Sequence, residues 1–161
     1  MPARALTLLA VIVVGLLSLG LLWLLGMRDK DSVVVTAQRR INRAVINPNA
    51  LKTAGSPGAY ASVIRHTGRT SGRQYETPVG AVPTEGGFVI GLMYGSQSDW
   101  LKNVLASGSA TIVHEGVTHP VDRPEVLAWE AAAQLFPEEE RRSFRLFGVR
   151  ECLRVRDVEA A

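Results

Sequence analysis

The chain has 161 residues, which allows one compact domain with an appendage and excludes two domains of ordinary size. Its single cysteine, Cys152, excludes an internal disulfide bond. Residues 28–73 hold nine Lys or Arg and two acidic residues, whereas residues 74–161 hold eight Lys or Arg and thirteen acidic residues. The basic part suits anionic lipid or an anionic ligand. The acidic remainder would repel phosphates, so we expect no nucleic acid as a partner.

An uncharged run from Ala5 to Met27 is the first predicted element. A helix needs roughly 20 residues to cross the hydrocarbon core of a bilayer, and this run is long enough. Trp23 lies near its end, where an indole prefers the headgroup level. A cleaved signal peptide is the alternative, but its apolar region spans only about 7–15 residues and ends in a small-residue site. We therefore predict that residues 1–28 are one transmembrane anchor.

Basic residues are more numerous after this run than before it. Arg28, Lys30 and Arg39 follow it closely, whereas Arg4 and the α-amino group precede it. The positive-inside rule therefore predicts a single-pass protein of the cell membrane with its globular domain in the cytoplasm. The lipid bilayer is its first predicted partner.

The segment 32–46 is predicted to be a basic amphipathic helix. Its apolar residues, on one face, are Val34, Ala37, Ile41, Ala44 and Val45, and its polar residues, on the other, are Gln38, Arg39, Asn42 and Arg43. The apolar face can lie along lipid headgroups or pack on the domain. Asn47-Pro48-Asn49 is predicted to end the helix, and Thr53–Gly58 is interpreted as a linker, so that residues 29–55 join the anchor to the domain.

Short strands and helices fill residues 56–161. Strands are expected at Tyr60–His66, Tyr75–Val82, Phe88–Tyr94, Ala110–His114, Val117–Val121 and around Leu153–Val155. Helices are expected at Ser98–Ala106, capped by Ser98 and followed by Gly108, from Pro124 to about Leu135, and from Pro137 to about Phe147, where Glu138–Glu140 form a solvated start. Antiparallel strands with a few helices predict an α+β fold, a small β-barrel.

The loop after the first strand is rich in groups that bind anions. Glycines let its backbone N–H groups converge, hydroxyls add donors, and arginines match phosphate or carboxylate. These residues are Thr67, Gly68, Arg69, Thr70, Ser71, Gly72 and Arg73. The loop predicts an anion cradle, and an ordinary polar hairpin loop is the alternative.

A second candidate segment runs from Gly95 to Asn103. Trp100 and Asn103 are three residues apart, so they share one face of the predicted helix, where an indole beside an amide suits a flat heteroaromatic ligand. Tyr94 precedes the segment and offers a hydroxyl. Core packing of Trp100 and Tyr94 is the alternative.

Other kinds of site find little support. His114 and His119 flank the turn at Glu115-Gly116 and can face each other across a hairpin, but solvated histidines at strand ends are the simpler interpretation. We therefore predict no metal site. The nucleophile pattern GxSxG is absent, so a serine hydrolase is not predicted.

The run HTGRTSGR, followed by Thr77-Pro78-Val79 and later by WLKNV from Trp100, resembles the deazaflavin-dependent nitroreductase family, whose members typically read close to TGRKSGxxRxxP and WxxNL. The C-terminal stretch from Trp129 to Arg156 is also similar to that family's ending. The resemblance covers about residues 40–156. It implies a mostly antiparallel split β-barrel of the FMN-binding, flavin-reductase type, with short helices. Residues 56–161 would be this deazaflavin-binding domain.

The resemblance also implies the cofactor, coenzyme F420, a deazaflavin with a phosphate and an acidic oligoglutamate tail; FMN is the alternative. The implied cofactor-binding residues are those of the anion-binding loop together with Thr77, Pro78, Leu92, Gly95, Trp100 and Asn103. Tyr94 and Ser96 would lie near the reactive carbon as catalytic residues. Thr70 and Tyr75 depart from the family, because each stands where a basic residue is common.

The predicted function is therefore a membrane-anchored oxidoreductase that transfers a hydride from reduced F420 to a small hydrophobic electron acceptor, such as a quinone or a nitro compound. The alternative is a split barrel that binds a lipid or fatty acid, a flavin or haem, without F420 turnover. Split barrels often pair, so a homodimer is a further expectation.

Overall fold

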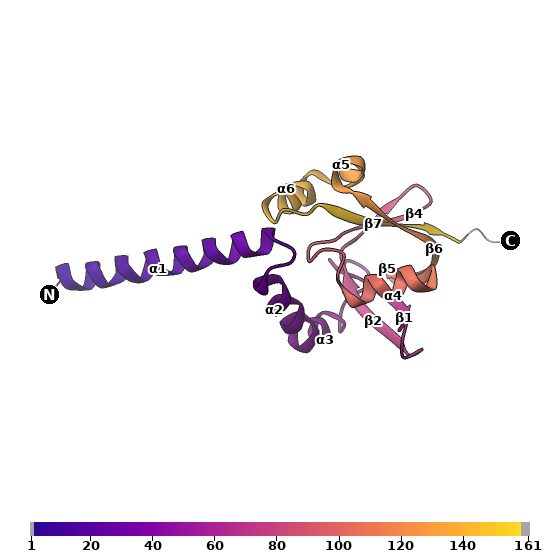
Figure 1. The fold of residues 1–161 in the computed structure, drawn as a ribbon, viewed down its shortest axis with the longest axis horizontal. Helices are drawn as coiled ribbons and strands as arrows, with labels where there is room; N and C mark the ends of the chain where they lie inside the picture. The colour runs from indigo at the N-terminus through magenta and orange to yellow at the C-terminus, as the bar shows by residue number, and fades with distance from the viewer. Residues whose placement is uncertain (1, 159–161) are drawn as a thin grey trace.

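The protein, in a computed structural model, consists of a compact domain from which one long helix projects (Figure 1). The structure describes residues 2–158; Met1 of the predicted anchor and residues 159–161 of the predicted barrel lie outside them. Helix α1 (Pro2–Arg28) confirms the first predicted helix. It is long and apolar enough to cross a membrane, a property that spans share with signal sequences, and only 6% of Val11–Arg28 is buried, which argues against a core helix.

Seven antiparallel strands form one sheet in the order β2-β1-β5-β6-β7-β4-β3. Their bounds are β1 Ser62–Thr67, β2 Gln74–Val79, β3 Ala81–Thr84, β4 Gly87–Gly91, β5 Ser109–His114, β6 Val117–Ala128 and β7 Glu151–Asp157. The sheet curls into a half-barrel, and this fits the split β-barrel of the predicted α+β fold.

Gly80 defines where the barrel is split. The strands β2 and β3 are the two outer strands of the sheet, yet Gly80 alone separates them in the chain. The two sheet edges must therefore meet at this residue and diverge beyond it. The single predicted strand Tyr75–Val82 was wrong in this respect, because its two halves pair with different partners: β2 with β1, and β3 with β4.

Helices cover the sheet on separate sides. Their bounds are α2 Val33–Ile41, the π-helix η1 Asn42–Ile46, α3 Asn47–Ala50, α4 Asp99–Ser107, α5 Trp129–Ala132, the 3₁₀ turn η2 Ala133–Leu135 and α6 Glu138–Leu146. Figure 1 shows α5 and α6 on one side of the domain, and α2, α3 and α4 on the other. Gly108 ends α4 in the left-handed conformation, as predicted.

The helix predicted for residues 32–46 begins as expected but does not stop at Asn47. It continues through η1 into α3, which ends at Ala50. Pro48 lacks an N–H group, and the wider π-helical turn before it lets the chain continue without the regular bond. The prediction that Asn47-Pro48-Asn49 ends the helix was therefore wrong.

The prediction of a helix from Pro124 to Leu135 was wrong over the first half of that segment. Strand β6 continues to Ala128, and Val126 pairs with Leu153 of β7. Pro124 lies in an irregularity between Asp122 and Glu125, where Arg123 takes a left-handed φ of 50°. A bulge leaves residues outside the ladder, so a proline costs no strand hydrogen bond there. Pairing with β7 thus overrides the local helix signal.

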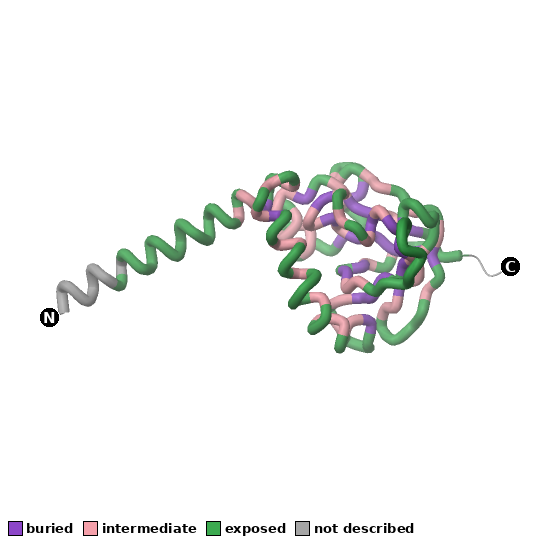
Figure 2. The backbone as a smooth tube through the Cα atoms, turned by 60° about the horizontal axis from the view of Figure 1, so that its bottom comes forward, coloured by how far each residue is buried: buried purple, intermediate pink, exposed green. Residues whose placement is uncertain are grey.

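Buried side chains fill both faces of the sheet. The barrel core, shown as purple segments in Figure 2, contains Ile64, Phe88, Ile90, Leu101 and Leu153 among others. A smaller cluster under α5 and α6 contains Val89, Ala132, Phe136 and Cys152. Because β4 contributes Phe88 and Ile90 to one cluster and Val89 to the other, it is buried on both faces.

Three smaller expectations need correction. The first and third strands are shorter than predicted, because Tyr60 lies outside β1 and Tyr94 lies in a turn after β4. The hydroxyl of Ser98 donates to the carbonyl of Gly95 at 3.1 Å and does not accept a helix N–H. Glu140 is not fully solvated: it is half-buried, and burial raises the pKa of its carboxyl group.

Candidate functional site

A cavity of about 260 Å³ lies at the split of the barrel, and we call it the split cavity. The end of β2 supplies one wall through Thr77, Pro78 and Gly80, and the end of β4 with the following loop supplies a second, including Leu92 and Tyr94. These walls adjoin because β2 and β3 part at Gly80, beside the end of β4. The position of the cavity therefore follows from the topology of the sheet.

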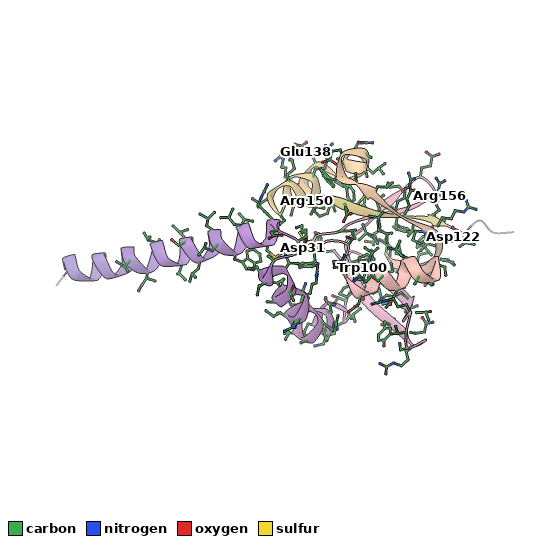
Figure 3. The ribbon with its side chains drawn as sticks, viewed as in Figure 1. Asp31, Trp100, Asp122, Glu138, Arg150 and Arg156 are labelled. Atoms are coloured by element: carbon green, nitrogen blue, oxygen red, sulfur yellow. The ribbon has the colours of Figure 1, made fainter. Side chains whose placement is uncertain are left out.

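The start of α4 forms the third wall. Trp100 lines the split cavity and packs its partly buried indole against the barrel core. Figure 3 labels Trp100 at the start of α4, on the side of the barrel that faces α2. Gln97 and Ser98 add polar groups beside it. An indole with amide and hydroxyl neighbours suits a flat, partly polar ring.

The fourth wall comes from the helix α2–η1–α3, which sequence reasoning did not include in the site. Arg39, Asn42, Arg43 and Asn47 line the split cavity from this helix. The guanidinium of Arg39 donates to the carbonyl of Tyr94 and so fixes the cavity loop to the helix. Helical spacing of these four polar residues was visible in the sequence. What the sequence did not reveal is that this face covers the barrel.

A second cavity, of about 420 Å³, lies next to the first, and we call it the loop cavity. It is lined by the β1–β2 loop through Gly68, Arg69, Thr70 and Ser71, and by His66, Tyr75 and Asn103. Arg43 and Asp99 line both cavities. The two predicted motif segments therefore border two adjoining cavities.

Asn103 connects the two motifs. Its Oδ1 accepts hydrogen bonds from the backbone N–H of Arg69 at 3.2 Å and from the Arg69 guanidinium at 2.8 Å. Asn103 is buried, so the accepting end of both hydrogen bonds is fixed inside the domain, whereas Arg69 itself is exposed. The exposed loop arginine is thus tied to α4.

Asp99 lies between two arginines. Its Oδ1 is 3.3 Å from Arg69 Nη2, and its Oδ2 accepts a hydrogen bond from Arg43. Burial raises the pKa of the Asp99 carboxyl group, but hydrogen bonds from Arg69 and Arg43 outweigh that effect and lower the pKa. The carboxylate therefore occupies the place where two guanidinium groups converge, which is the geometry that binds an anion.

His66 is buried within this network. The Asn103 amide nitrogen lies 3.2 Å from His66 Nδ1, and Thr77 Oγ1 lies 3.2 Å from Nε2. Because an amide nitrogen is a donor, Nδ1 must accept and Nε2 carries the proton. Burial lowers the pKa of His66, which favours this neutral form. His66 thus links Thr77 of the split cavity to Asn103.

The far end of the β1–β2 loop faces solvent. The guanidinium of Arg73 lies 5.5 Å from the ring centre of Tyr75, and its Nη2 is 3.1 Å from the Tyr75 hydroxyl. Hydrogen bonds from Ser71 and Arg73 lower the pKa of Tyr75. A Cβ atom on Gly68 would stand 2.5 Å from Ser71 Oγ and 2.6 Å from Tyr75 Cε2, so a side chain here would require the Ser71 and Tyr75 side chains to shift.

A third cavity, of about 500 Å³, is lined by Gly95 and Ser96 together with Lys30, Arg150 and Glu151. Lys30 Nζ donates to the carbonyls of Met27 at 2.8 Å, Met93 at 2.9 Å and Phe147 at 2.7 Å. Burial, with the nearby charges of Arg150, Arg28 and Arg39, lowers the pKa of Lys30 to about 8.

Twelve of the fifteen predicted site residues line one of the three cavities. Those at the split cavity are Thr77, Pro78, Leu92, Tyr94 and Trp100; those at the loop cavity are Gly68, Arg69, Thr70, Ser71 and Asn103; and Gly95 and Ser96 line the third cavity. Thr67, Gly72 and Arg73 line none of these three cavities. His114 and His119 are not directly opposite each other, because they pair with Val117 and Ile112 in the ladder, but both rings pack edge-on against Phe88, at centre distances of 5.7 and 5.0 Å.

No protein-family model matches the chain, and no curated protein matches it. Among solved structures, an F420-H2 dependent reductase (FDR-A) is 17% identical over 60% of this chain and 93% of that chain, with a TM-score of 0.44. An F420 reductase is 8% identical over 67% and 92% of the two chains, with a TM-score of 0.45. A protein of the pyridoxinephosphate oxidase family from Clostridium acetobutylicum, related to general stress protein 26, is 7% identical over 74% and 84%, with a TM-score of 0.46. The solved structures similar to this chain thus include F420-H2 dependent reductases, at low identity.

Proposed function

We propose that this protein is a membrane-anchored oxidoreductase that binds coenzyme F420 and passes a hydride from its reduced form to a hydrophobic acceptor such as a quinone or a nitro compound. One observation carries the proposal. Arg69 of the TGR-type loop and Asn103 of the WLKN segment are hydrogen-bonded to each other and both line the loop cavity, which adjoins the split cavity. The residues on which the family resemblance rests therefore converge on one site.

The chemistry of the lining residues fits such a cofactor. The split cavity offers apolar surface from Pro78, Leu92 and Trp100 to a flat ring. Arg43 lines both cavities, Arg69 lines the loop cavity, and both suit the negative phosphate and tail. In the proposed complex the anionic group replaces the Asp99 carboxylate between these two arginines.

We assign each residue a limited role in this proposal. Trp100 and Pro78 hold the ring, and Arg43 and Arg69 hold the negative part. Arg39 acts as a positioning residue, since it donates to the carbonyl of Tyr94 in the cavity loop. When bound, reduced F420 supplies a hydride, and the acceptor takes up that hydride together with a proton. Tyr94 lines the split cavity and is the better placed of the two predicted catalytic residues; Ser96 lies at the neighbouring cavity.

The proposed location is the cytoplasmic face of the cell membrane. Helix α1 has the length and composition of a span, and its side chains between Val11 and Trp23 are exposed to solvent in the isolated chain. Exposed apolar side chains on this scale need a lipid or protein environment. An anchor raises the local concentration of a lipid-soluble acceptor near the cavity.

The test uses the full chain in lipid nanodiscs, titrated in parallel with F420, FMN and haem. We expect F420 to bind, and we expect the double variant Arg43→Ala with Arg69→Ala to weaken binding by about 10- to 100-fold, because each lost charge-assisted bond contributes on the order of 1.5–3 kcal/mol before partial compensation. The variant Arg73→Ala is the matched control, because Arg73 lies on Tyr75 and lines neither adjoining cavity. Its affinity should stay near that of the wild type.

Turnover is tested separately, by following oxidation of reduced F420 with a quinone in the same nanodiscs. Binding without oxidation by quinones or nitro compounds would refute the acceptor class while leaving the cofactor proposal intact. If only FMN or only haem bound, that molecule would be assigned as the cofactor in place of F420. If a fatty acid co-purified with the protein and F420 did not bind, the result would support a lipid carrier.

A further inference from the structure

The end of α1 is tied firmly to the domain. Met27 is buried, with 2% of its surface exposed. The ring of Trp23 packs edge-on against the ring of Phe147, and the ring centres are 5.9 Å apart. Arg28 Nη1 donates to the carbonyls of Arg145 at 3.0 Å and Leu146 at 2.8 Å. These contacts join α1 to the end of α6. If α1 crosses a bilayer, one side of the domain is therefore held toward that bilayer.

The chain turns sharply between α1 and α2. The Ser32 hydroxyl donates to the carbonyl of Gly26 at 2.6 Å, and a Cβ atom on Gly26 would stand 2.5 Å from Val34 Cγ2, so the two helices touch where they meet. In Figures 1 and 2, α2 and α3 lead away from the axis of α1 along the side of the domain from which α1 projects. The helix therefore runs along the side that would face the membrane.

The outward face of this helix is apolar and unpartnered. Val33 is 84% exposed, Ile41 50% and Val45 57%, and the exposed Ala37 lies between them at the same four-residue spacing. Leu146, which is half exposed, lies at the end of α6 beside Arg28. We call these five residues the apolar face. It adjoins the end of α1 on two sides.

The opposite face of the same helix is committed to the domain. Val35 is fully buried, and Arg39, Asn42 and Arg43 line the split cavity. The apolar face thus cannot be explained as core packing. Its exposed neighbours include Arg40 and Arg28, whose charge suits anionic headgroups.

We propose that the apolar face is a membrane-contact surface, which lies in the headgroup region of the bilayer that α1 crosses. The inference rests on the transmembrane part of the proposed function. It adds a second contact between the protein and the bilayer, besides α1. The bilayer is the chosen occupant because the face continues from the end of α1 and stands on the side held toward the membrane. An amphipathic helix with basic flanks binds such an interface through its apolar side.

A consequence follows for the split cavity. One helix would meet lipid with Val33, Ile41 and Val45 and line the cavity with Arg39 and Arg43. The cavity would then lie within one helix diameter of the headgroups, about 10 Å. A molecule dissolved in the bilayer would reach it without a long path through water.

The test places one environment-sensitive nitrobenzoxadiazole label on the full chain in nanodiscs that contain anionic lipid. The native Cys152 is fully buried and its thiol pKa is raised to about 11 by burial, so the unmodified chain serves as the labelling blank. Labels go on Val33→Cys, Ile41→Cys and Val45→Cys. Arg156→Cys is the control, since Figure 3 labels Arg156 at the end of the domain away from α1.

We expect labels at 33, 41 and 45 to be quenched by spin-labelled lipid at least about twofold more than the label at 156. A label on Leu17→Cys, in the middle of α1, reports separately whether α1 is in the bilayer. Quenching at 17 with none at 33, 41 and 45 would overturn the membrane-contact surface and leave the anchor standing. No quenching at 17 would overturn both. If the labels at 33, 41 and 45 were shielded from solvent in detergent and the protein formed a dimer there, the apolar face would be assigned to a second copy of the chain. That result would overturn the inference.

Discussion

Asn103 accepts two hydrogen bonds from Arg69, one from its backbone N–H and one from its guanidinium, and donates its amide N–H toward His66 Nδ1. One amide group therefore fixes both the loop arginine and the tautomer of the buried histidine. Asn103 and His66 are both buried, so water cannot replace their contact without rearrangement. This relationship connects β1, the β1–β2 loop and α4, and two of the predictions below depend on it.

Replacing Asn103→Ala should loosen the β1–β2 loop. The Arg69 backbone N–H and His66 Nδ1 lose their partners, and an unsatisfied buried polar group costs about 1–3 kcal/mol. We expect a lower melting temperature and weaker F420 binding, measured by thermal unfolding and by titration of the full chain. Arg73→Ala, whose guanidinium is exposed, should leave both close to wild type. An unchanged melting temperature for Asn103→Ala would contradict the proposed positioning role.

Replacing Asp99→Asn should strengthen binding of an anionic ligand. The carboxylate now lies between Arg43 and Arg69 and competes for their guanidinium groups. Because both pairs are largely exposed, the gain is expected to be modest, about threefold to tenfold in affinity. Glu76→Gln is the matched control, since Glu76 pairs with Arg65 on the strands and lines neither cavity. Weaker binding by Asp99→Asn would show that the carboxylate orients the arginines instead of competing for them.

Acidification should destabilise the protein through His66. Its pKa in the folded chain lies below the ordinary value of 6.5, so the unfolded chain takes up a proton first as the pH falls. Stability is therefore fully present above pH 6.5 and is lost as the pH falls toward the folded pKa. Protonated Nδ1 would also turn the oxygen of the Asn103 amide toward His66 and away from Arg69, so F420 affinity should fall in the same range.

The measurement for His66 is the melting temperature and F420 affinity of the full chain between pH 7.5 and pH 5. His66→Gln should flatten both profiles relative to wild type. Thr77→Val serves as the control for the melting-temperature profile, because it removes the hydrogen-bond partner of Nε2 and keeps the titrating ring. If His66→Gln kept the wild-type slope, another group would be responsible.

Lys30 should produce a pH dependence on the alkaline side. Its pKa is about 8 in the folded chain, against an ordinary value of 10.5, so between these values the unfolded chain holds a proton that the folded chain has released. Deprotonation then favours the folded state, and the stability of the wild type should rise relative to Lys30→Met as the pH rises from 8 to 10.5. Thermal unfolding of both proteins across this range gives the difference. A constant difference would contradict the lowered pKa.

Much of the fold could be predicted because it depends on local patterns. Alternating apolar residues and Gly-containing turns located most strands within a few residues, although β6 runs on to Ala128 from its predicted end at Val121, and Gly108 located the end of α4. The uncharged run before Arg28 predicted α1. Each of these signals arises from neighbours in the chain, so no knowledge of distant contacts was needed.

The site was less predictable, because its members come from segments far apart in the chain. The motif residues Arg69 and Asn103 were identified by type and spacing, but their hydrogen bonds depend on α4 packing against β1. Arg39 and Arg43 were interpreted as a basic membrane-proximal surface, yet they line the split cavity. Arg73 carries the same charge but does not line the split cavity, because its guanidinium is hydrogen-bonded to the hydroxyl of Tyr75.

The sequence by itself determined the long apolar helix, the alternating strands and the anion-binding residue types, since these follow from composition and short-range periodicity. Only the tertiary structure decided that Gly80 splits one predicted strand between two sheet edges and that β6 continues past Pro124. Strand pairing and helix docking set those outcomes. They depend on surfaces that exist only after folding, and a local pattern carries no record of which partner a strand or helix face will meet.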